Sequence, residues 1–387
     1  MQILHLVPSL SRNAGGLGSA PLATARAQRD VGVDASIWCA DPPAVATAAA
    51  RGFDVVAFPV AGPRRFAFSP AAERRGRTAS PDIVHQHGLW TAQGRVTRIL
   101  RSRGIRTVVA PHGSLAPYAL RRSRWRKRFA LTWFESHNLH EASCLHATSA
   151  GEVQAFRQFG LRAPVAVIPN GVSPSWLATV GDRSGFRRRY GIDDETPVML
   201  FLSRIHPIKG LPMLLAALAR HREQLARWRL LIAGPDEAGH RAEIERLVAR
   251  LGVSGSVSFL GPLLEEPKRD AFAAADLFVL PTHTENFGIV IAEALACRLP
   301  VITTQAAPWR ELDVNGCGWW VPPDTASIGA ALLDAASRPL EDLRAMGARG
   351  HALVASHYLW PLVAERTIGL YRWLLGHGER PFFVTVD

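Results

Sequence analysis

The chain has 387 residues, of which 48% are hydrophobic and 20% are charged, and its formal net charge is +12. This composition is typical of a folded globular protein and excludes a disordered one, and the length favours two domains over a single core. The longest apolar runs are far shorter than the ~20 residues of a membrane-spanning helix.

The first half of the sequence alternates predicted strands and helices. Strands are expected at Ile3–Val7, Ser36–Trp38, Val55–Phe58, Ile83–His87, Thr107–Ala110, Cys144–Ala147 and Val165–Ile168. A loop that contains Gly15 and Gly16 separates the first strand from a predicted helix at Ala20–Val31. Short apolar strands of this kind are typical of parallel sheets that are covered on both faces.

The second half repeats the alternation after a break at Ile168–Pro174, which contains two prolines and an Asn-Gly pair. Strands are expected at Val198–Leu202, Leu230–Ala233, Val257–Leu260, Leu277–Leu280, Val301–Thr303 and Trp319–Val321. We therefore predict an α/β protein with two doubly wound, Rossmann-like domains, at residues 1–170 and 171–358, that face each other across a cleft. An amphipathic helix within 359–387 should cross back onto the first domain.

The segment Glu285–Glu293 is the most informative stretch of the chain. It follows a predicted strand and has a loop with Gly288 before an apolar helix start. Such a turn directs free backbone N–H groups, here those of Phe287, Gly288 and Ile289, toward an anion. Two carboxylates, Glu285 and Glu293, flank these amides and suit sugar hydroxyls. The combination predicts a nucleotide-sugar site.

Two cations follow the first strand of the second half. Arg204 and Lys209 lie in a loop that ends at Gly210. At the carboxyl end of a parallel strand, both could clamp a diphosphate. The alternative is an ordinary pair of surface cations.

Several histidines lie at or near predicted strand ends. His112 directly follows a strand, where it could contact a sugar, although a lone histidine is more often structural. His85 and His87 could line a cleft or be structural, and His206, between Arg204 and Lys209, is equally open.

A basic segment occurs at residues 121–128, where six positive charges fall within eight residues. It contains Arg121, Arg122, Arg124, Trp125, Arg126, Lys127 and Arg128. With the aromatic residues that recur beside it up to Phe134, it predicts binding to an anionic membrane surface, and a solvated helix face is the alternative. Because no nucleic-acid-binding signature accompanies it, we expect no nucleic-acid partner.

The compartment is inferred from the N-terminus and the cysteines. The N-terminus has no signal-peptide pattern, and Cys39, Cys144, Cys297 and Cys317 are scattered without metal-ligand spacing. We expect buried free thiols in a cytoplasmic protein, peripheral on the inner face of the cytoplasmic membrane.

Five motifs occur together in the chain. They are Pro111–Gly113, Ile168–Val172, Arg204–Lys209, Ile232–Pro235 and Glu285–Glu293. On these motifs the chain resembles, over nearly its whole length, the retaining glycosyltransferases of the GT-B fold from family 4, also called glycosyl transferases group 1, of the bacterial polysaccharide-biosynthesis type.

The resemblance implies roles for individual residues. Arg204 and Lys209 would hold the donor's phosphates and stabilise the leaving nucleotide. Glu285 would lie beside the donor sugar, Glu293 would accept hydrogen bonds from the ribose hydroxyls, and His112 would lie near the transferred sugar. The further donor-binding positions are Gly15, Gly16, Asn170, Gly234, Asn286, Phe287, Gly288 and Ile289.

No metal or other cofactor is expected. The chain lacks the Asp-x-Asp metal motif of GT-A enzymes, and Asp193-Asp194 is predicted to lie in a surface loop. Arg204, Lys209 and a helix N-terminus can neutralise a leaving diphosphate without a metal ion.

The predicted activity is retaining transfer of a hexose from GDP-mannose or a UDP-hexose to a saccharide acceptor. A lipid-linked acceptor in surface polysaccharide or lipopolysaccharide synthesis fits the basic segment best. A soluble synthase of a small glycoside, disaccharide or disaccharide phosphate is the main alternative. A sugar-nucleotide epimerase and a nucleic-acid-binding module are weaker alternatives.

Overall fold

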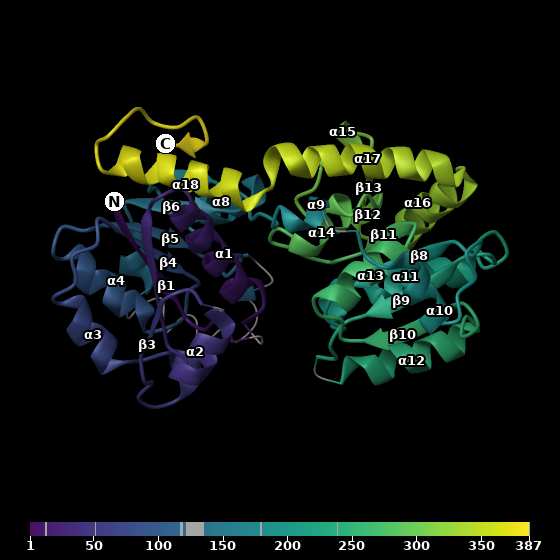
Figure 1. The fold of residues 1–387 in the computed structure, drawn as a ribbon, viewed down its shortest axis with the longest axis horizontal. Coiled ribbons are helices and arrows are strands. Elements are labelled where there is room, and N and C mark those ends of the chain that lie inside the picture. Colours follow the sequence, from purple (N-terminus) through teal and green to yellow (C-terminus); the bar gives the residue numbers. More distant parts are fainter. Residues whose placement is uncertain are drawn as a thin grey trace. The chain divides into compact units, whose positions relative to one another are not determined.

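The computed structural model describes residues 1–11, 14–50, 52–116, 119–120, 135–178, 180–237 and 239–386. The chain forms two compact units (Figure 1): unit 1 contains residues 1–171 and 360–387, and unit 2 contains residues 172–359. These limits lie within one residue of the joints expected at 170 and 358. The basic segment from Arg121 to Arg128, expected to contact a membrane, lies outside the described residues.

Unit 1 is built on an eight-stranded sheet with the order β14-β7-β6-β5-β4-β1-β2-β3. Its strands are β1 (Gln2–Val7), β2 (Asp34–Cys39), β3 (Val55–Ala57), β4 (Ile83–His87), β5 (Arg106–Ala110), β6 (Cys144–Ala147), β7 (Val165–Val167) and β14 (Val384–Thr385). The first seven strands are parallel, as their apolar runs predict, and β14 pairs antiparallel with β7. The sequence did not predict β14, because two residues carry no periodic pattern.

The helices of unit 1 flank this sheet. They are α1 (Gly16–Asp30), α2 (Pro43–Ala50), α3 (Pro70–Gly76), α4 (Gln93–Arg101), α7 (Ser136–His140), α8 (Ala150–Gln158) and α18 (Trp360–Leu374), with a short 3₁₀ helix, η2, at Arg64–Phe66. Helix α1 begins four residues before the predicted start at Ala20. Helix α18 packs on α1. It begins against Gly171, where a Cβ atom would lie 2.8 Å from the backbone nitrogen of Trp360.

Unit 2 is built on a six-stranded parallel sheet with the order β10-β9-β8-β11-β12-β13. Its strands are β8 (Val198–Leu202), β9 (Arg229–Ala233), β10 (Val257–Gly261), β11 (Leu277–Leu280), β12 (Val301–Thr304) and β13 (Gly318–Val321). Its helices are α9 (Ser175–Ala178), η4 (3₁₀, Pro207–Lys209), α10 (Arg183–Arg189), α11 (Leu211–Arg220), α12 (His240–Leu251), α13 (Glu266–Ala274), α14 (Ile289–Ala296), α15 (Glu311–Val314), α16 (Thr325–Ser337) and α17 (Leu340–His357). Every residue of β8 and β11 is buried, because helices cover both faces of the central strands.

The strand order reverses once in each sheet. The reversal lies between β1 and β4 in unit 1 and between β8 and β11 in unit 2. Connections from the two adjacent strands leave in opposite directions there and open a crevice at the carboxyl ends, where open α/β sheets bind ligands. Candidate site residues should therefore be sought just after these four strands.

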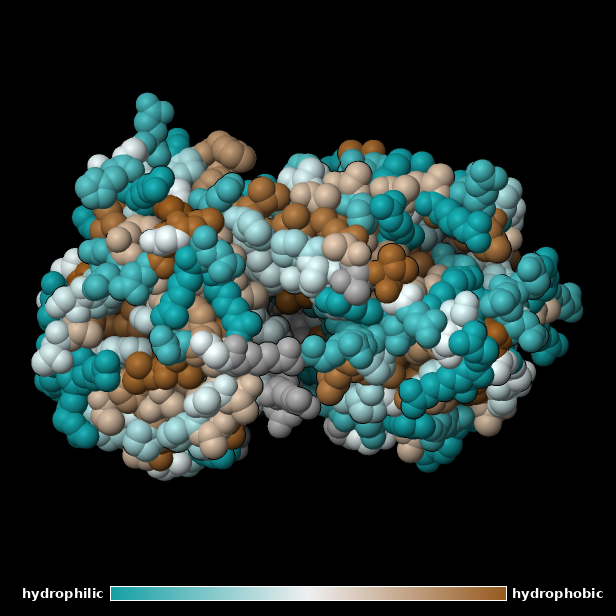
Figure 2. Space-filling view, in the orientation of Figure 1, coloured by the Kyte–Doolittle hydropathy of each residue, from teal (hydrophilic) through white to brown (hydrophobic). Residues whose placement is uncertain are grey.

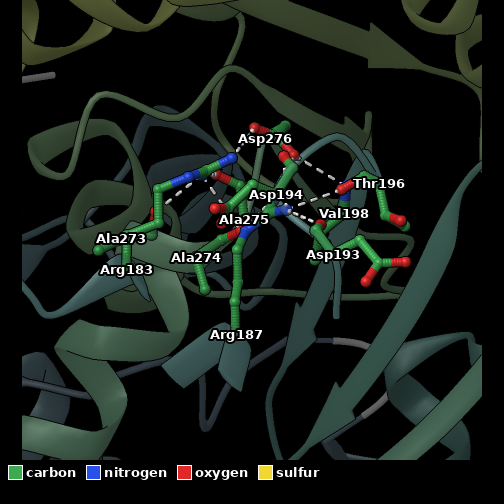
Figure 3. Close-up of polar contacts among 10 residues, drawn as sticks. All are labelled: Arg183, Arg187, Asp193, Asp194, Thr196, Val198, Ala273, Ala274, Ala275 and Asp276. Atoms are coloured by element: carbon green, nitrogen blue, oxygen red, sulfur yellow. Dashed lines mark hydrogen bonds and ion pairs between the residues drawn. The ribbon is translucent and has the colours of Figure 1, made fainter. Parts of the chain in front are cut away.

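A buried ion-pair network fixes the opposite, amino-terminal end of the unit 2 sheet (Figure 3). Asp276, just before β11, accepts hydrogen bonds from Arg183 and Arg187 of α10 at 3.0 Å each and from the amide of Val198 at 2.9 Å. The guanidinium of Arg187 also donates to the carbonyl oxygens of Asp193, Asp194, Thr196 and Ala274. Burial lowers the pKa of Arg187, so these acceptors are needed to hold its charge. The network anchors α10 and the exposed Asp193–Asp194 loop.

In the part of the chain that the structure describes, no helix is long and apolar enough to cross a bilayer. The most exposed large hydrophobic residues, Val180, Val314 and Phe382, are far apart in the sequence. Hydrophilic side chains cover most of the face of unit 2 that Figure 2 shows.

Candidate active site

The loops after β8 and β11 are joined at the strand-order reversal of unit 2. The carbonyl oxygen of Ile208 in η4 accepts hydrogen bonds from the amide of His283 at 2.7 Å and from the hydroxyl of Thr282 at 3.0 Å. Gly210 has φ +72°, and a Cβ atom there would lie 1.8 Å from the carbonyl oxygen of Pro281. Only glycine fits this approach, so the sequence around Gly210 brings the two loops together.

His206 has a structural role in this loop. Its Nδ1 accepts a hydrogen bond from the amide of Ile208 at 3.1 Å and so caps η4. This cap fixes the short helix that carries Lys209 at its last position. The structural role is thus one of the two alternatives that the sequence left open for His206.

Lys209 forms an ion pair with Glu285, across the joined loops. The side chains of Lys209 and Glu285 are 9% and 16% exposed. A partly buried pair of this kind is screened less by water than a surface pair. An ammonium has three donors, so a carboxylate partner orients Lys209 and leaves donors for phosphate oxygens.

The N-terminus of α14 follows directly. Gly288 caps the helix with φ +80°, and the carbonyl oxygen of the buried Phe287 accepts a hydrogen bond from the indole of Trp309 at 2.5 Å. The rings of Phe287 and Trp309 pack with centroids 5.2 Å apart. This packing holds the turn rigidly, so the first amides of α14, from Ile289 onward, have a fixed direction. Asn286, between Glu285 and Phe287, is half-buried.

The second carboxylate of the motif has a partner that the sequence did not reveal. Glu293, one turn inside α14, is 8% exposed and accepts a hydrogen bond from Nζ of Lys268 at 2.5 Å. Lys268 also lies over the ring of Trp176, 5.2 Å from its centroid. The rarity of lysine in this chain could have drawn attention to Lys268. Only three of the 45 basic residues are lysines, namely Lys127, Lys209 and Lys268.

Arg204 lies in a different environment from Lys209. Its side chain is 55% exposed and forms an ion pair with Glu237 in the loop after β9. Gly234 lets this loop approach, since its φ is +144° and a Cβ atom would lie 1.8 Å from the carbonyl oxygen of Ser203. Gly234 thus acts through the backbone, and Arg204 is the more exposed of the two cations.

In unit 1, the predicted glycine loop follows β1 at the strand-order reversal. Gly15 is exposed, has φ +54° and caps α1, whose first residue is Gly16. Gly18 is the glycine that packing requires, because a Cβ atom there would lie 2.7 Å from the carbonyl oxygen of Ser9. Asn170 lies after β7, next to Gly171, and is half-buried.

The predicted histidines belong to a larger cluster. His5 on β1, His85 and His87 on β4, His112 after β5 and His146 on β6 lie side by side and bond to one another. The strand register places His5 beside His85. The sequence missed His5 and His146, which look like single polar residues in apolar strands.

Burial keeps all five imidazoles neutral. It lowers the pKa of His5 and His146 to about 4 and that of His112 to about 3, and it holds the pKa values of His85 and His87 well below the usual value. His112 has φ +49°, a strained conformation for a non-glycine residue. Its neighbour Gly113 is tied down by an amide hydrogen bond of 2.6 Å to the carboxylate of the buried Glu152.

One group in the described residues has spacing that could suit a metal ion. The ring nitrogens through which His5, His85 and His87 could bind a metal ion lie within 4.8 Å of one another. The ring nitrogens of these residues already bond to each other or to Gln28, Tyr371 and other histidines. The four cysteines are free, and burial raises their pKa values to about 11 or 12, so none is a ready nucleophile. Three are buried as expected, and Cys297 is half-buried.

Each of the two units matches a known protein family. Residues 196–338 match the family described as "Glycosyl transferases group 1", and residues 15–171 match the "Glycosyl transferase 4-like domain". A D-inositol 3-phosphate glycosyltransferase of Geodermatophilus obscurus is 30% identical over 322 residues, which span 79% of this chain and 70% of that protein. The chain belongs to the glycosyl transferases group 1 family. A second D-inositol 3-phosphate glycosyltransferase, of Stackebrandtia nassauensis, is 28% identical over 93% of this chain and 87% of that protein.

Solved structures of GT-B glycosyltransferases share the fold. Sucrose-phosphate synthase of Thermosynechococcus elongatus aligns with a TM-score of 0.79 and 22% identity over 98% of this chain and 100% of that chain. HepE of Anabaena, solved with UDP and glucose, aligns with a TM-score of 0.74 and 22% identity over 95% of this chain and 98% of that chain. These structures confirm the predicted GT-B fold, and the family match confirms the predicted glycosyltransferase activity.

Proposed function

We propose that this group 1 glycosyltransferase moves a hexose from a UDP-hexose to a hydroxyl group of a saccharide acceptor, with retention of the α configuration. The observation that carries the proposal is the convergence of Lys209, Glu285 and the N-terminus of α14 at the strand-order reversal of unit 2. HepE, which shares the fold, was solved with UDP and with UDP-glucose. That likeness favours a UDP-sugar over GDP-mannose.

The diphosphate is the group that this surface suits best. The amides at the start of α14 are fixed hydrogen-bond donors with a positive dipole end. Lys209 adds an oriented ammonium, and Arg204, which is exposed, can turn from Glu237 toward a phosphate oxygen. Together these groups stabilise the charge that develops as the nucleotide leaves, and loss of one such contact costs roughly 3 kcal/mol of barrier.

The two carboxylates recognise hydroxyl groups. Glu293 is buried next to Lys268, so its charge is held in place to accept hydrogen bonds from the ribose. Glu285 orients Lys209 with one oxygen and accepts from the donor sugar with the other.

The transfer itself needs no dedicated base. The bond between the anomeric carbon and the diphosphate oxygen breaks, and the acceptor oxygen bonds to the same face of that carbon. The acceptor proton passes to the departing phosphate oxygen. His112, which is neutral because burial lowers its pKa, serves as a hydrogen-bond partner for a sugar hydroxyl. Since Lys209, Arg204 and the α14 amides neutralise the diphosphate, we propose that no metal ion is required.

The acceptor is proposed to be a lipid-linked saccharide at the inner face of the cytoplasmic membrane. The basic segment 121–128 supports this by its sequence alone. WaaG, "a glycosyltransferase involved in lipopolysaccharide biosynthesis", shares the fold with a TM-score of 0.71 and 18% identity over 97% of this chain. A small phosphorylated acceptor is a second candidate, because the curated relatives are named D-inositol 3-phosphate glycosyltransferases.

Product analysis tests the proposal. The full chain is incubated with UDP-glucose, UDP-galactose or GDP-mannose, with and without EDTA, and with lipid-linked saccharides or with inositol and hexose phosphates as acceptors. We expect an α-glycoside made from a UDP-hexose, at equal rates with EDTA. A β-linked product would overturn retention, and loss of activity in EDTA would overturn metal independence.

A further inference from the structure

A continuous chain of polar side chains crosses the core of unit 1. In order it contains His112, His87, His5, Gln28, Tyr371, His85 and His146, and it ends at the carbonyl oxygen of Ile168. His112 is half-buried, and all the other side chains of this polar chain are buried. Because an imidazole in the neutral state has one donor and one acceptor, such a chain has a direction. The contact of Gln28 with Thr367 in the middle of the chain and the contact of His146 with Ile168 at its far end fix that direction.

Gln28 is oriented by a residue outside the chain. The hydroxyl of Thr367 donates to the carbonyl oxygen of Ala364 at 2.8 Å, so its oxygen accepts from Nε2 of Gln28 at 3.0 Å. Oε1 of Gln28 therefore faces Nε2 of His5, 2.9 Å away. An amide oxygen only accepts, so His5 must carry its proton on Nε2.

The same argument assigns the protonated nitrogen of each histidine on the branch from His5 to His112. Nδ1 of His5 is an acceptor, so His87 donates to it from Nε2 at 2.9 Å. Nδ1 of His87 is then an acceptor, and His112 donates to it from Nε2 at 3.0 Å. This leaves Nδ1 of His112 unprotonated, as a hydrogen-bond acceptor.

The other branch is fixed independently at its far end. The carbonyl oxygen of Ile168 accepts from Nε2 of His146 at 2.8 Å, and Nδ1 of His146 accepts from Nε2 of His85 at 3.2 Å. Nδ1 of His85 therefore accepts from the hydroxyl of Tyr371 at 2.7 Å. The Tyr371 oxygen in turn accepts from Nε2 of Gln28 at 3.4 Å. The two assignments meet at Gln28 without conflict.

A unidirectional chain also polarises its members, because each donated proton makes the next lone pair a better acceptor. Burial lowers the pKa values of the five histidines, so the chain stays uncharged near neutral pH. The metal-like spacing of His5, His85 and His87 is explained by these hydrogen bonds.

We propose that Gln28, His5 and His87 are positioning residues that hold His112 in the Nε2–H tautomer, with Nδ1 presented to accept a hydrogen bond from a sugar hydroxyl. The proposal rests on the sugar-transfer function only for the identity of the hydroxyl. The tautomer chain itself is a property of unit 1 and can be measured without substrate.

Three variants of the full chain separate positioning from stability. Gln28→Leu removes the acceptor of His5 and allows the branch to reverse, which moves the His112 proton to Nδ1. Tyr371→Phe breaks the links of Tyr371 to His85 and to Nε2 of Gln28, but it leaves the branch to His112 intact because Thr367 still orients Gln28. Gln86→Leu is the matched control: it is a buried amide on β4 that bonds to Thr97 and Asn138, outside the chain.

The readouts are two-bond proton–nitrogen NMR spectra of ¹⁵N-histidine-labelled protein and the kcat and KM of sugar transfer. We expect Nε2–H tautomers for the five histidines in the wild type. In Gln28→Leu, His112 should change tautomer and kcat/KM should fall roughly five- to tenfold, as for one lost hydrogen bond. In Tyr371→Phe and Gln86→Leu, the His112 tautomer and kcat/KM should be kept.

Several results would overturn the inference. One is a proton on Nδ1 of His112 in the wild type, which can be seen even if Gln28→Leu does not fold. Another is an equal loss of kcat/KM in Gln28→Leu and Gln86→Leu with unchanged tautomers. A third is a stoichiometric metal ion bound by His5, His85 and His87. Absence of any sugar transfer would contradict the proposed function, while the spectra would still decide the tautomer chain.

Discussion

Lys209 and Glu285 are 76 positions apart in the sequence and form an ion pair between the loops that follow β8 and β11. The pair exists because these strands are neighbours in the sheet and because Gly210 lets the backbone of Pro281 approach. It gives the positive charge of Lys209 a fixed position beside the N-terminus of α14. The proposed donor site is built on this relationship.

The carboxylate of Glu293 should govern nucleotide affinity. Glu293→Gln should weaken UDP binding by roughly 1.5–3 kcal/mol, about 10- to 150-fold, because charged hydrogen bonds to the ribose are lost. Titration calorimetry with UDP measures the change. Glu245→Gln, in the exposed pair with Arg241 on α12, is the control and should leave affinity unchanged. Equal affinity of Glu293→Gln and wild type would contradict the assignment.

Stability should fall with mild acid because of the histidine cluster. The unfolded chain protonates its histidines near pH 6.5, whereas burial lowers the folded pKa values of His5 and His146 to about 4. The unfolded state thus binds more protons below pH 6.5, and stability present above that pH is lost as the pH falls toward 4. Each such histidine contributes a slope of about 1.4 kcal/mol per pH unit.

Urea denaturation at pH 7.0, 6.0 and 5.0 measures this slope above the usual pKa values of carboxylates. Glu135, whose pKa burial raises to about 7, contributes one slope of opposite sign in this range. A double variant, His5→Phe with His146→Leu, should reduce the slope even if its total stability is lower. A flat stability profile between pH 7 and pH 5 would show that the cluster is charged or solvated in the folded state.

The Arg187–Asp276 network should contribute to stability and not to catalysis. Arg187→Met leaves Asp276 with only Arg183 as a charged partner and several carbonyl groups without their donor. Removal of one partner of a buried ion pair typically costs about 3–5 kcal/mol. Guanidinium denaturation should show this loss, and Arg241→Gln, at an exposed pair, should change stability by less than about 1 kcal/mol. A selective loss of donor affinity in folded Arg187→Met would disagree with a purely structural role.

The joined loops can be tested through a matched pair of glycines. Gly191 and Gly210 both have positive φ, of +62° and +72°, but a Cβ atom meets nothing within 4 Å at Gly191 and meets the Pro281 carbonyl at Gly210. Gly191→Ala should cost only the left-handed strain of about 1–2 kcal/mol. Gly210→Ala should cost clearly more and should also raise KM for the donor, because Lys209 moves from Glu285. Thermal unfolding and donor kinetics compare the two, and equal effects would mean that the loops are not tied there.

Much of this architecture was predictable because it follows from local patterns. Buried parallel strands such as Val198–Leu202 and Leu277–Leu280 are continuous apolar runs, and the structure gives them those same bounds. The Glu285–Glu293 segment, which follows a predicted strand, predicted a turn and a helix start, and α14 begins at Ile289. The expected role of Lys209 rested on its position after the carboxyl end of a strand and on the family resemblance, and the neighbouring positions of β8 and β11 came only from the structure.

What the sequence could not provide are the partners that only tertiary structure brings together. Lys268 on α13 forms an ion pair with Glu293 on α14, and Glu237 meets Arg204 through a backbone approach at Gly234. His5 and His146 are isolated in sequence and become a cluster only when β1, β4 and β6 form one sheet. The two-residue strand β14 is too short for any pattern.

The most direct test of the account is calorimetric titration of wild-type protein and the Lys209→Met variant with UDP and with uridine. The account predicts that the wild type binds UDP at least ~100-fold more tightly than uridine, and that Lys209→Met loses most of this difference, because the ammonium and the α14 amides bind the diphosphate. Uridine affinity should be the same in both proteins. If Lys209→Met kept the full preference for UDP over uridine, the diphosphate would bind elsewhere and the proposed donor site would be wrong.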